Sequence, residues 1–271
     1  MGLRLMKAAV LGHPVRRSLS PALHNAGYRA LGMVEWSYTA IDCTEDRFDR
    51  VLGRAGQGCA GFSVTMPLKR VALAAATRRT SLAQVTGAAN TLLPRRNGWL
   101  ADNTDVAGIV AALREYSIEP ARGSVALLGA GGAAQAAVVA LASLGVRRVT
   151  VAVRSAARAA DLVSTARRAK ISVRLADLSP YVVRDAALVV SAMPAEAAAR
   201  VAGFDVGPDQ ALLDMVYQPW PTPLARLYLA VGAPVASGHD MLLHQAARQF
   251  ELMTGRDAPL AAMRAALPAR P

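Results

Sequence analysis

The sequence has few cysteines, few aromatic residues and little negative charge. Cys43 and Cys59 are the only cysteines, too few for a disulfide framework or a metal cluster, so we expect a reducing cytoplasm and no metal site. Both thiols are expected to pack in the core. No apolar run approaches the roughly 20 residues of a membrane helix. The short apolar run Ala8–Leu11 is soon followed by His13 and two arginines, which does not fit a signal peptide.

The charge balance is strongly basic, with 31 Lys and Arg against 19 Asp and Glu. A basic surplus suits nucleic-acid binding. Here the arginines are scattered in pairs such as Arg147-Arg148, and no basic run is interleaved with aromatic residues, which make up only 5%. We therefore expect no nucleic-acid partner, and a positive field that attracts small anions. A chain of 271 residues that is 53% hydrophobic predicts one large or two medium globular domains.

Short apolar segments alternate with helical stretches, which is typical of an α/β protein. Strands are predicted at Lys7–Leu11, Trp36–Asp42, Gly61–Thr65, Val125–Leu128, Arg148–Val153, Ala187–Ala192 and Leu212–Val216, with a hairpin at Asn90–Pro94 and Gly98–Ala101. Helices are predicted at Pro21–Leu31, Glu45–Leu52, Leu68–Ala76, Thr104–Tyr116, Gly132–Leu144, Ser155–Ala169 and Asp240–Thr254. Pro21 suits a first helical turn with Ser20 as its N-cap. The polar stretch Ser117–Gly123 leads into a second unit.

One glycine-rich turn indicates a dinucleotide site. The predicted strand Val125–Leu128 runs directly into Gly129–Ala134, which has the pattern G-x-G-x-x-G/A with alanine in the last place. The first glycine permits the tight turn, the second admits a pyrophosphate, and the small last residue lets the helix pack on its strand. The helix N-terminus then offers unpaired N–H groups to the anion. The alternative is an ordinary tight turn. The residues expected to bind the cofactor here are Gly129, Ala130, Gly131, Gly132, Ala133 and Ala134.

The end of the next predicted strand indicates which dinucleotide binds. An NAD site places Asp or Glu about 20 residues after the loop, to bind the ribose hydroxyl. No carboxylate occurs between Gly129 and Asp161, and the strand ends instead at Arg154-Ser155, with Arg158 one turn later. A guanidinium and a hydroxyl fit a 2′-phosphate, which a carboxylate would repel. The sequence therefore predicts NADP, although Ser155 could simply cap a helix.

Polar clusters in the first half suggest a second site. Ser18 and Ser20 would point the same way in an extended segment and could hold one carboxylate. Lys69 follows a predicted strand end, where ligands bind in α/β sheets. Asn90 and Asp105 lie in polar stretches of the same kind. Each cluster could also be turn chemistry or a helix cap.

Taken together and in order, these segments resemble the shikimate dehydrogenase family over nearly the whole chain. The matching motifs are S-L-S-P-A-L-H-N (Ser18–Asn25), G-F-S-V-T-M-P-L-K (Gly61–Lys69), A-N-T (Ala89–Thr91), D-N-T-D-x-x-G (Asp102–Gly108), G-A-G-G-A-A (Gly129–Ala134), D-M-V-Y-Q-P-W-P-T-P-L (Asp214–Leu224) and M-L-L-H-Q-A (Met241–Ala246). The resemblance implies an N-terminal α/β substrate domain, residues 1–106 with 239–271, and a Rossmann-like doubly wound NADP domain, residues 107–238, with a cleft between them.

The resemblance also implies roles for single residues. Lys69 and Asp105 match the catalytic pair, and Ser18 and Ser20 the ligands of the substrate carboxylate. The other positions carried over are substrate-binding Thr65, Asn90, Tyr217 and Gln245 and, near the cofactor, Met215, Gly238, Arg154, Ser155 and Arg158. The implied reaction is NADPH-dependent reduction of 3-dehydroshikimate by a cytoplasmic enzyme that could form a homodimer.

Several positions depart from the family pattern. Ser63 stands where many relatives carry Asn, Arg17 where His is frequent, and Val153-Arg154-Ser155 where Asn-Arg-Thr is more usual. His239 and Asp240 replace small or apolar residues and are expected to cap a helix start. The alternatives are a quinate or aminoshikimate dehydrogenase of the same superfamily, and an NADP-binding regulatory protein without catalysis.

Overall fold

The computed structural model describes residues 5–55 and 58–268, and the chain divides into two compact units. The first unit extends to Thr104 and resumes at Leu243, and the second runs from Asp105 to Leu242. The domain boundaries expected from the sequence lie a few residues away, at 106/107 and 238/239. In the described part of the chain, no helix combines the length and the apolar character that a membrane crossing requires.

The first unit is built on a six-stranded mixed sheet in the order β2-β1-β3-β5-β6-β4. The strands are β1 (Met6–Gly12), β2 (Trp36–Asp42), β3 (Cys59–Val64), β4 (Arg78–Arg79), β5 (Thr91–Arg95) and β6 (Gly98–Asp102). The strand β5 is antiparallel to both β3 and β6, whereas the other pairs are parallel. The carboxyl ends of β1, β3 and β6 therefore meet the start of β5 at one edge, and the register aligns Ser63, Thr91 and Asp102 there.

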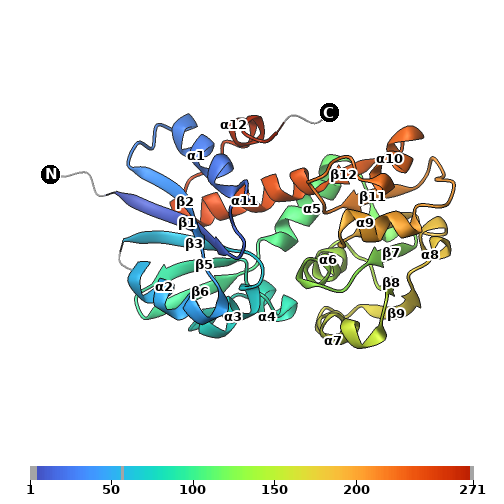
Figure 1. Cartoon of the computed structure of the whole chain (residues 1–271), viewed down its shortest axis with the longest axis horizontal. Coiled ribbons are helices and arrows are strands. Elements are labelled where there is room, and N and C mark those ends of the chain that lie inside the picture. The colour runs from blue at the N-terminus through green and yellow to red at the C-terminus, as the bar shows by residue number, and fades with distance from the viewer. Residues whose placement is uncertain (1–4, 56–57, 269–271) are drawn as a thin grey trace. The chain divides into compact units, whose positions relative to one another are not determined.

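Helices cover both faces of this sheet, as Figure 1 shows. One face carries α1 (Ser20–Ala30), α12 (Leu260–Ala265) and α11 (Gly238–Thr254), and the other carries α2 (Phe48–Ala55), α3 (Lys69–Ala75) and α4 (Ser81–Thr86). Alternate residues of the buried strand β1 supply the core on the second face, where Ala9 and Leu11 pack in the cluster that includes Phe48 and Leu68.

The second unit is an all-parallel sheet in the order β12-β11-β10-β7-β8-β9. Its strands are β7 (Val125–Leu128), β8 (Arg148–Val153), β9 (Ser172–Asp177), β10 (Leu188–Ser191), β11 (Ala211–Asp214) and β12 (Val235–Ser237). Numbered within the unit this order is 3-2-1-4-5-6, the doubly wound dinucleotide-binding arrangement, and the winding reverses between β7 and β10. The predicted fold class is confirmed.

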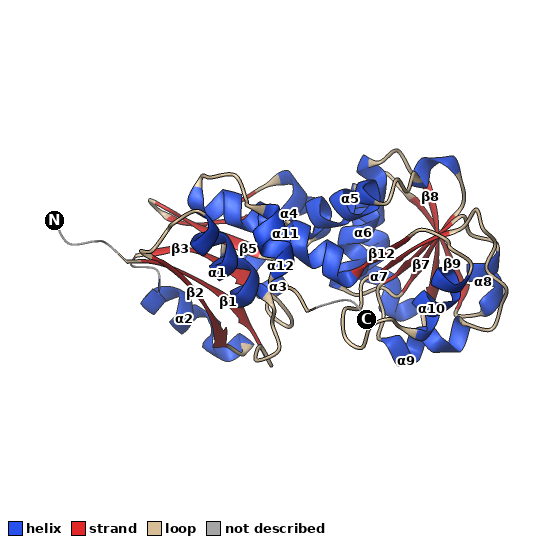
Figure 2. Ribbon diagram, turned by 90° about the horizontal axis from the view of Figure 1, so that it is seen from above, coloured by secondary structure: helices blue, strands red, loops and turns tan. Residues whose placement is uncertain are grey.

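Two helical layers flank the second sheet, as Figure 2 shows. One contains α5 (Asp105–Glu115), α6 (Gly132–Ser143) and α7 (Ala160–Arg168), which pack in that order. The other contains α8 (Pro180–Arg184), α9 (Ala195–Ala198) and α10 (Pro223–Ala230), whose apolar side chains form a core with Leu128, Val189 and Leu212 of the strands. Strands that are buried on both faces explain the uninterrupted apolar runs of the sequence.

Several elements were not predicted. The strand β9 carries exposed polar side chains at a sheet edge, and β12 is three residues long, so neither shows a strong apolar pattern. Short helices α4, α8, α9, α10 and α12 were also missed. The predicted helices at residues 45–52 and 155–169 each begin with a 3₁₀ turn before α2 and α7.

The two predicted caps had different outcomes. Ser20 is not the N-cap of α1: the helix begins at Ser20 itself, and Leu19 before it is already helical. Asp240, the third residue of α11, takes part in its cap, because its carboxylate accepts from the backbone N–H and the hydroxyl of Ser237 at 2.9 and 2.8 Å. The Asp240 N–H donates back to Ser237 Oγ at 3.4 Å, which completes a capping box.

His24 of α1 is fully buried in the first unit. Its ring stacks on Tyr38 of β2, with centroids 4.1 Å apart and planes 10° apart, and neither ring nitrogen forms a well-oriented hydrogen bond in the described residues. Burial lowers the pKa of His24 to about 3, against a smaller opposing effect of the Gln249 side chain. The imidazole therefore packs as a neutral aromatic ring.

We expect the unfolding free energy of His24→Phe to fall less at acid pH than that of the wild type. The folded state resists protonation of His24 while the unfolded chain accepts a proton near the ordinary value of 6.5, so the unfolding free energy falls as pH falls from 6.5 towards 3. At pH 5 the wild type has therefore lost about 2 kcal/mol of unfolding free energy. His24→Phe does not lose it, because a phenyl ring takes up no proton. Urea unfolding of both proteins at pH 5 and pH 8 measures the difference, and parallel curves would contradict the assignment.

Candidate active site

The glycine-rich turn lies at the carboxyl end of β7, where the winding of the second sheet reverses. Gly129 has a φ of +99°, and a Cβ there would lie 3.1 Å from the carbonyl oxygen of Ala192, which follows β10. Only glycine fits this left-handed turn at such close approach. Gly131 and Gly132 instead have open space where a side chain would project. Among the described residues no side chain caps the start of α6, so its first N–H groups lack a partner within the helix and are available to an anion.

A pocket of about 600 Å³ opens beside this turn. It is lined by Gly129, Ala130 and Gly131 after β7 and by Ala192, Met193 and Pro194 after β10. Arg154, directly after β8, and Arg158, in the following 3₁₀ turn, also line it, and Arg200 joins them from the segment after α9. Glycine backbone, a helix N-terminus and three guanidinium groups against the single carboxylate of Glu196 can hold a polyanionic dinucleotide.

Met215 and Gly238 meet where β11 and β12 end. A Cβ at Gly238 would lie 2.4 Å from the carbonyl oxygen of Met215, so the backbone of the two segments is in direct contact. Tyr217 lies close by, with its ring 5.8 Å from that of His239, and burial raises its pKa. These residues form the rest of the carboxyl edge of the second sheet.

Asn90 is the centre of a buried polar cluster in the first unit. Its Oδ1 accepts from the backbone N–H of Thr104 at 2.8 Å and from the hydroxyl of Thr91 at 2.8 Å. Its Nδ2 donates to Thr104 Oγ1 at 2.9 Å and to Gln245 Oε1 at 3.2 Å. Asn90 and Gln245, predicted from distant parts of the sequence, are thus brought into contact.

Ser18, Ser20, Thr65 and Lys69 lie on segments around the same edge. The predicted extended geometry of Ser18 and Ser20 is wrong, because residue 19 is helical and Ser18 Oγ accepts from the Ser20 N–H at 3.3 Å. The Thr65 N–H donates to Leu11 at the end of β1. Lys69 begins α3, and its carbonyl accepts from Ala89 at 2.9 Å, which ties that helix to the segment before Asn90. Asp105, the predicted partner of Lys69, is buried and begins α5 as the first residue of the second unit.

Comparison with known proteins gives one family. Residues 10–92 match the shikimate dehydrogenase substrate binding domain, residues 113–201 the shikimate / quinate 5-dehydrogenase domain, and residues 238–267 the shikimate 5'-dehydrogenase C-terminal domain. The NADP-dependent shikimate dehydrogenase of Halobacterium salinarum is 38% identical over 265 residues, which cover 96% of this chain and 98% of the relative. The chain belongs to the shikimate dehydrogenase family.

Solved structures of this family share the whole fold. The crystal structure of Mycobacterium tuberculosis shikimate dehydrogenase superposes with a TM-score of 0.87 at 44% identity, covering 97% of this chain and 100% of that one. The Thermus thermophilus enzyme, solved in complex with NADP(H) and shikimate, superposes with a TM-score of 0.82 at 33% identity, covering 96% and 98%. The family predicted from the motifs is confirmed.

Sequence reasoning missed part of the pocket beside the glycine turn. It is also lined by Met193, Pro194 and Arg200, which follow the glycine turn by about sixty positions and carry no motif. Ser155, which was predicted together with Arg154, is exposed and does not line this pocket. A small residue at position 134 was expected to let the helix pack on its strand, and Ala134 is fully buried.

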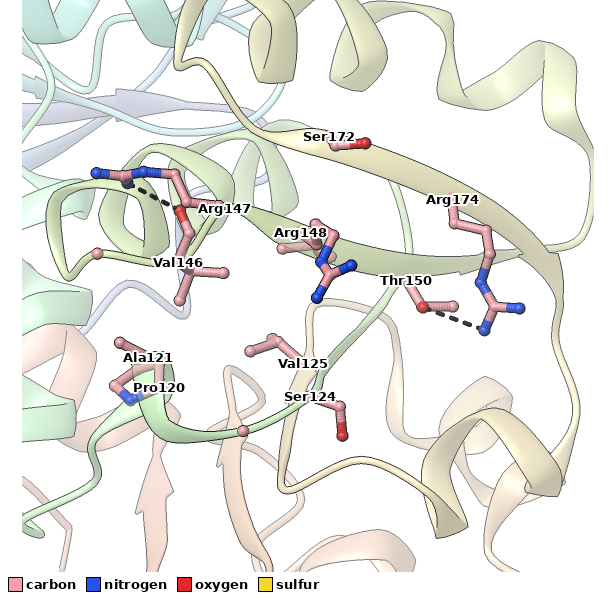
Figure 3. A pocket seen from close by; sticks show the side chains of 13 residues that line it. Pro120, Ala121, Ser124, Val125, Val146, Arg147, Arg148, Thr150, Ser172 and Arg174 are labelled. Carbon is pink, nitrogen blue, oxygen red and sulfur yellow. Dashed lines mark hydrogen bonds between the residues drawn. The ribbon is translucent and has the colours of Figure 1, made fainter.

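A second pocket, of about 590 Å³, lies at the opposite end of the second sheet, where β7, β8 and β9 begin (Figure 3). Arg147, Arg148 and Arg174 line it, and all three are exposed. The Arg147 guanidinium donates to the carbonyls of Ala142 and Val146. Ligands of open α/β sheets usually bind at the carboxyl ends of strands, which is where the glycine turn lies and this pocket does not.

We expect Gly238→Ala to destabilise the protein by about 1–3 kcal/mol, because the added methyl group must displace the Met215 backbone. The matched control is Gly132→Ala at the start of α6, where nothing lies within 4 Å of the new Cβ. There, stability should stay equal or rise slightly, since alanine favours helix over glycine by about 1 kcal/mol. Urea denaturation compares the variants, and equal midpoints would contradict the close approach at Gly238.

Proposed function

We propose that this protein is an NADP-dependent shikimate dehydrogenase, which interconverts shikimate and 3-dehydroshikimate. The observation that carries the proposal is the glycine turn at the switch point of the second sheet, with Arg154 and Arg158 beside it, in a chain of this family. Relatives named as NADP-dependent shikimate dehydrogenases over nearly the whole chain support it. We place the reaction in the cytoplasm, in the biosynthesis of aromatic compounds.

The cofactor assignment follows from the residues at the pocket. The open backbone at Gly131 and Gly132 admits a pyrophosphate, and Arg154 and Arg158 supply positive charge for a 2′-phosphate. When bound, NADPH supplies the hydride for reduction of the carbonyl carbon. Met215 and Gly238 are assigned to the nicotinamide side of this site.

In the first unit, Ser18 and Ser20 are assigned to the substrate carboxylate. Asn90 and Gln245 are assigned to a ring hydroxyl, and Thr65 and Tyr217 are assigned as further substrate-binding residues. A hydroxyl both donates and accepts, and the contact between Asn90 Nδ2 and Gln245 Oε1 offers one donor and one acceptor. A substrate hydroxyl inserted there can satisfy both groups.

Lys69 and Asp105 are assigned as the catalytic pair. Reduction of a ketone builds negative charge on its oxygen, which a positioned donor must stabilise. The Lys69 ammonium can donate to this oxygen and deliver or relay a proton, and the Asp105 carboxylate can orient the ammonium. In the oxidative direction the same pair removes the hydroxyl proton.

A quinate dehydrogenase is the alternative from the same superfamily. Quinate has one more hydroxyl, on the carbon that carries the carboxylate, and Ser20 stands where some quinate users have Thr. A basic residue at position 154 also suits NADP better than NAD. A non-catalytic NADP-binding regulator is disfavoured because Lys69 and Asp105 are both present.

We expect Lys69→Ala to lower kcat by about 10²–10⁴-fold with a much smaller change in the KM for shikimate, because general acid–base catalysis acts in the transition state. Lys7→Ala, an exposed lysine near the start of β1, is the matched control and should retain wild-type kinetics. A large rise in KM with kcat intact would refute the catalytic role.

An assay panel of shikimate or quinate with NADP⁺ or NAD⁺ tests the function itself. We expect the highest kcat/KM with shikimate and NADP⁺. Arg154→Ala should raise the KM for NADP⁺ by about tenfold or more and leave that for NAD⁺ nearly unchanged, since a charge-assisted contact to a phosphate is lost. Arg148→Ala, at the opposite end of the same strand, is the control. Preference for quinate and NAD⁺ would overturn the proposal.

A further inference from the structure

A continuous chain of buried hydrogen bonds lies behind the Asn90–Gln245 contact, and the proposed mechanism does not use it. The Tyr38 hydroxyl donates to Ser63 Oγ at 2.5 Å, and the Ser63 hydroxyl donates to Gln249 Oε1 at 2.6 Å. Gln249 Nε2 donates to the backbone carbonyl of Asn90 and to Thr91 Oγ1, both at 3.0 Å. Every one of these side chains is at most 4% exposed.

The direction of each bond in this chain is fixed by backbone groups. A carbonyl oxygen only accepts, so the group that Gln249 presents to the Asn90 carbonyl is its NH₂, and its oxygen faces Ser63. Ser63 must then donate to Gln249 and accept from Tyr38. At the other end, the backbone N–H of Thr104 only donates, so Asn90 turns its Oδ1 to Thr104 and its Nδ2 to Gln245.

Tyr38 is suited to remain the donor at the start of the chain. Burial raises its pKa well above the ordinary value, against a smaller opposing effect of the bond to Ser63, so the phenol stays protonated. The Asn25 side chain binds the backbone of Tyr38 twice: it donates to the Tyr38 carbonyl at 2.8 Å and accepts from the Tyr38 N–H at 2.9 Å. His24 stacks on its ring. Two residues of the motif Ser18–Asn25 therefore hold Tyr38 in place.

Gln245 and Gln249 are one helical turn apart on α11, so they project from the same face of the helix. Gln249 bonds to the backbone of Asn90, and Gln245 contacts the Asn90 side chain. The bond of Gln249 therefore holds α11 against the start of β5. It thereby fixes the distance between Gln245 and Asn90.

We propose that Tyr38, Ser63 and Gln249 are positioning residues that orient Asn90 and Gln245 so that together they accept a substrate hydroxyl and reject a group that cannot both donate and accept. This inference rests on the proposed function, because it concerns the residues that hold the side chains assigned to the substrate hydroxyl.

The test is steady-state kinetics of Ser63→Ala and Tyr38→Phe with shikimate and with analogues that each lack one non-reacting ring hydroxyl. Loss of the Ser63 hydroxyl leaves Gln249 Oε1 without its donor and frees the amide to turn. We expect the KM for shikimate to rise about tenfold, with kcat and the KM for NADP⁺ within about twofold of wild type. For the analogue whose missing hydroxyl meets Asn90 and Gln245, the kcat/KM penalty relative to shikimate should shrink.

The matched control is Tyr28→Phe. Tyr28 is also a buried tyrosine of the first unit, at 2% exposure, but its hydroxyl has no hydrogen-bond partner in the described residues. It should retain wild-type kinetics with every substrate. Tyr38→Phe makes the same chemical change on the hydrogen-bond chain, and it keeps the test valid if Ser63→Ala does not fold.

The outcomes separate this inference from the proposed function. Wild-type protein that does not oxidise shikimate would overturn the function and this inference with it. Wild-type activity, with folded Ser63→Ala and Tyr38→Phe showing an unchanged KM for shikimate and an unchanged analogue penalty, would overturn the inference alone. Equal rises in the KM values for shikimate and for NADP⁺ would indicate a general structural role of these residues and would also overturn the inference.

Discussion

The carbonyl oxygen of Asn90 accepts two hydrogen bonds, from the backbone N–H of Val64 at 2.7 Å and from Gln249 Nε2 at 3.0 Å. The first bond continues the ladder between β3 and β5, and the second attaches α11 to that ladder. The polar edge of the first unit depends on this junction, because it joins a strand end, a strand start and a helix from the far end of the chain. The Asn90 side chain is held in one orientation by separate bonds, because its Oδ1 accepts from the Thr104 N–H and the Thr91 hydroxyl.

The second unit differs from the first in its glycine turn, where a phosphate can approach the backbone closely. Gly129 permits the turn against Ala192, whereas Gly131 and Gly132 leave their N–H groups accessible. The arginines supply charge from other segments of the same sheet. The proposed function assigns recognition of hydroxyl groups to the buried amides of the first unit, and recognition of an anion to the backbone and guanidinium groups of the second. Each unit uses the chemistry that its proposed ligand requires.

Burial decides the protonation states that these arrangements need. Tyr38 remains a neutral donor and His24 a neutral ring because neither is accessible to water. Asp214, at the end of β11, is also buried, and burial raises its pKa although Thr222 and the Val216 N–H donate to its carboxylate. These polar groups lie inside the units because hydrogen bonds or ring stacking replace the contacts that water would make.

Local patterns in the sequence were sufficient for the glycine turn, the α/β class and the family, because each was read from short motifs of residues close together along the chain. The network around Asn90 was not accessible in this way. Asn90, Thr104, Gln245 and Gln249 come from three separate segments, and the sheet register and the packing of α11 decide that they touch. The same holds for Arg200, which reaches the pocket beside the glycine turn only through the winding of the second sheet. Sequence determined which chemical groups are present, and tertiary structure decided their partners, because hydrogen-bond direction and distance are set only after the strands are paired.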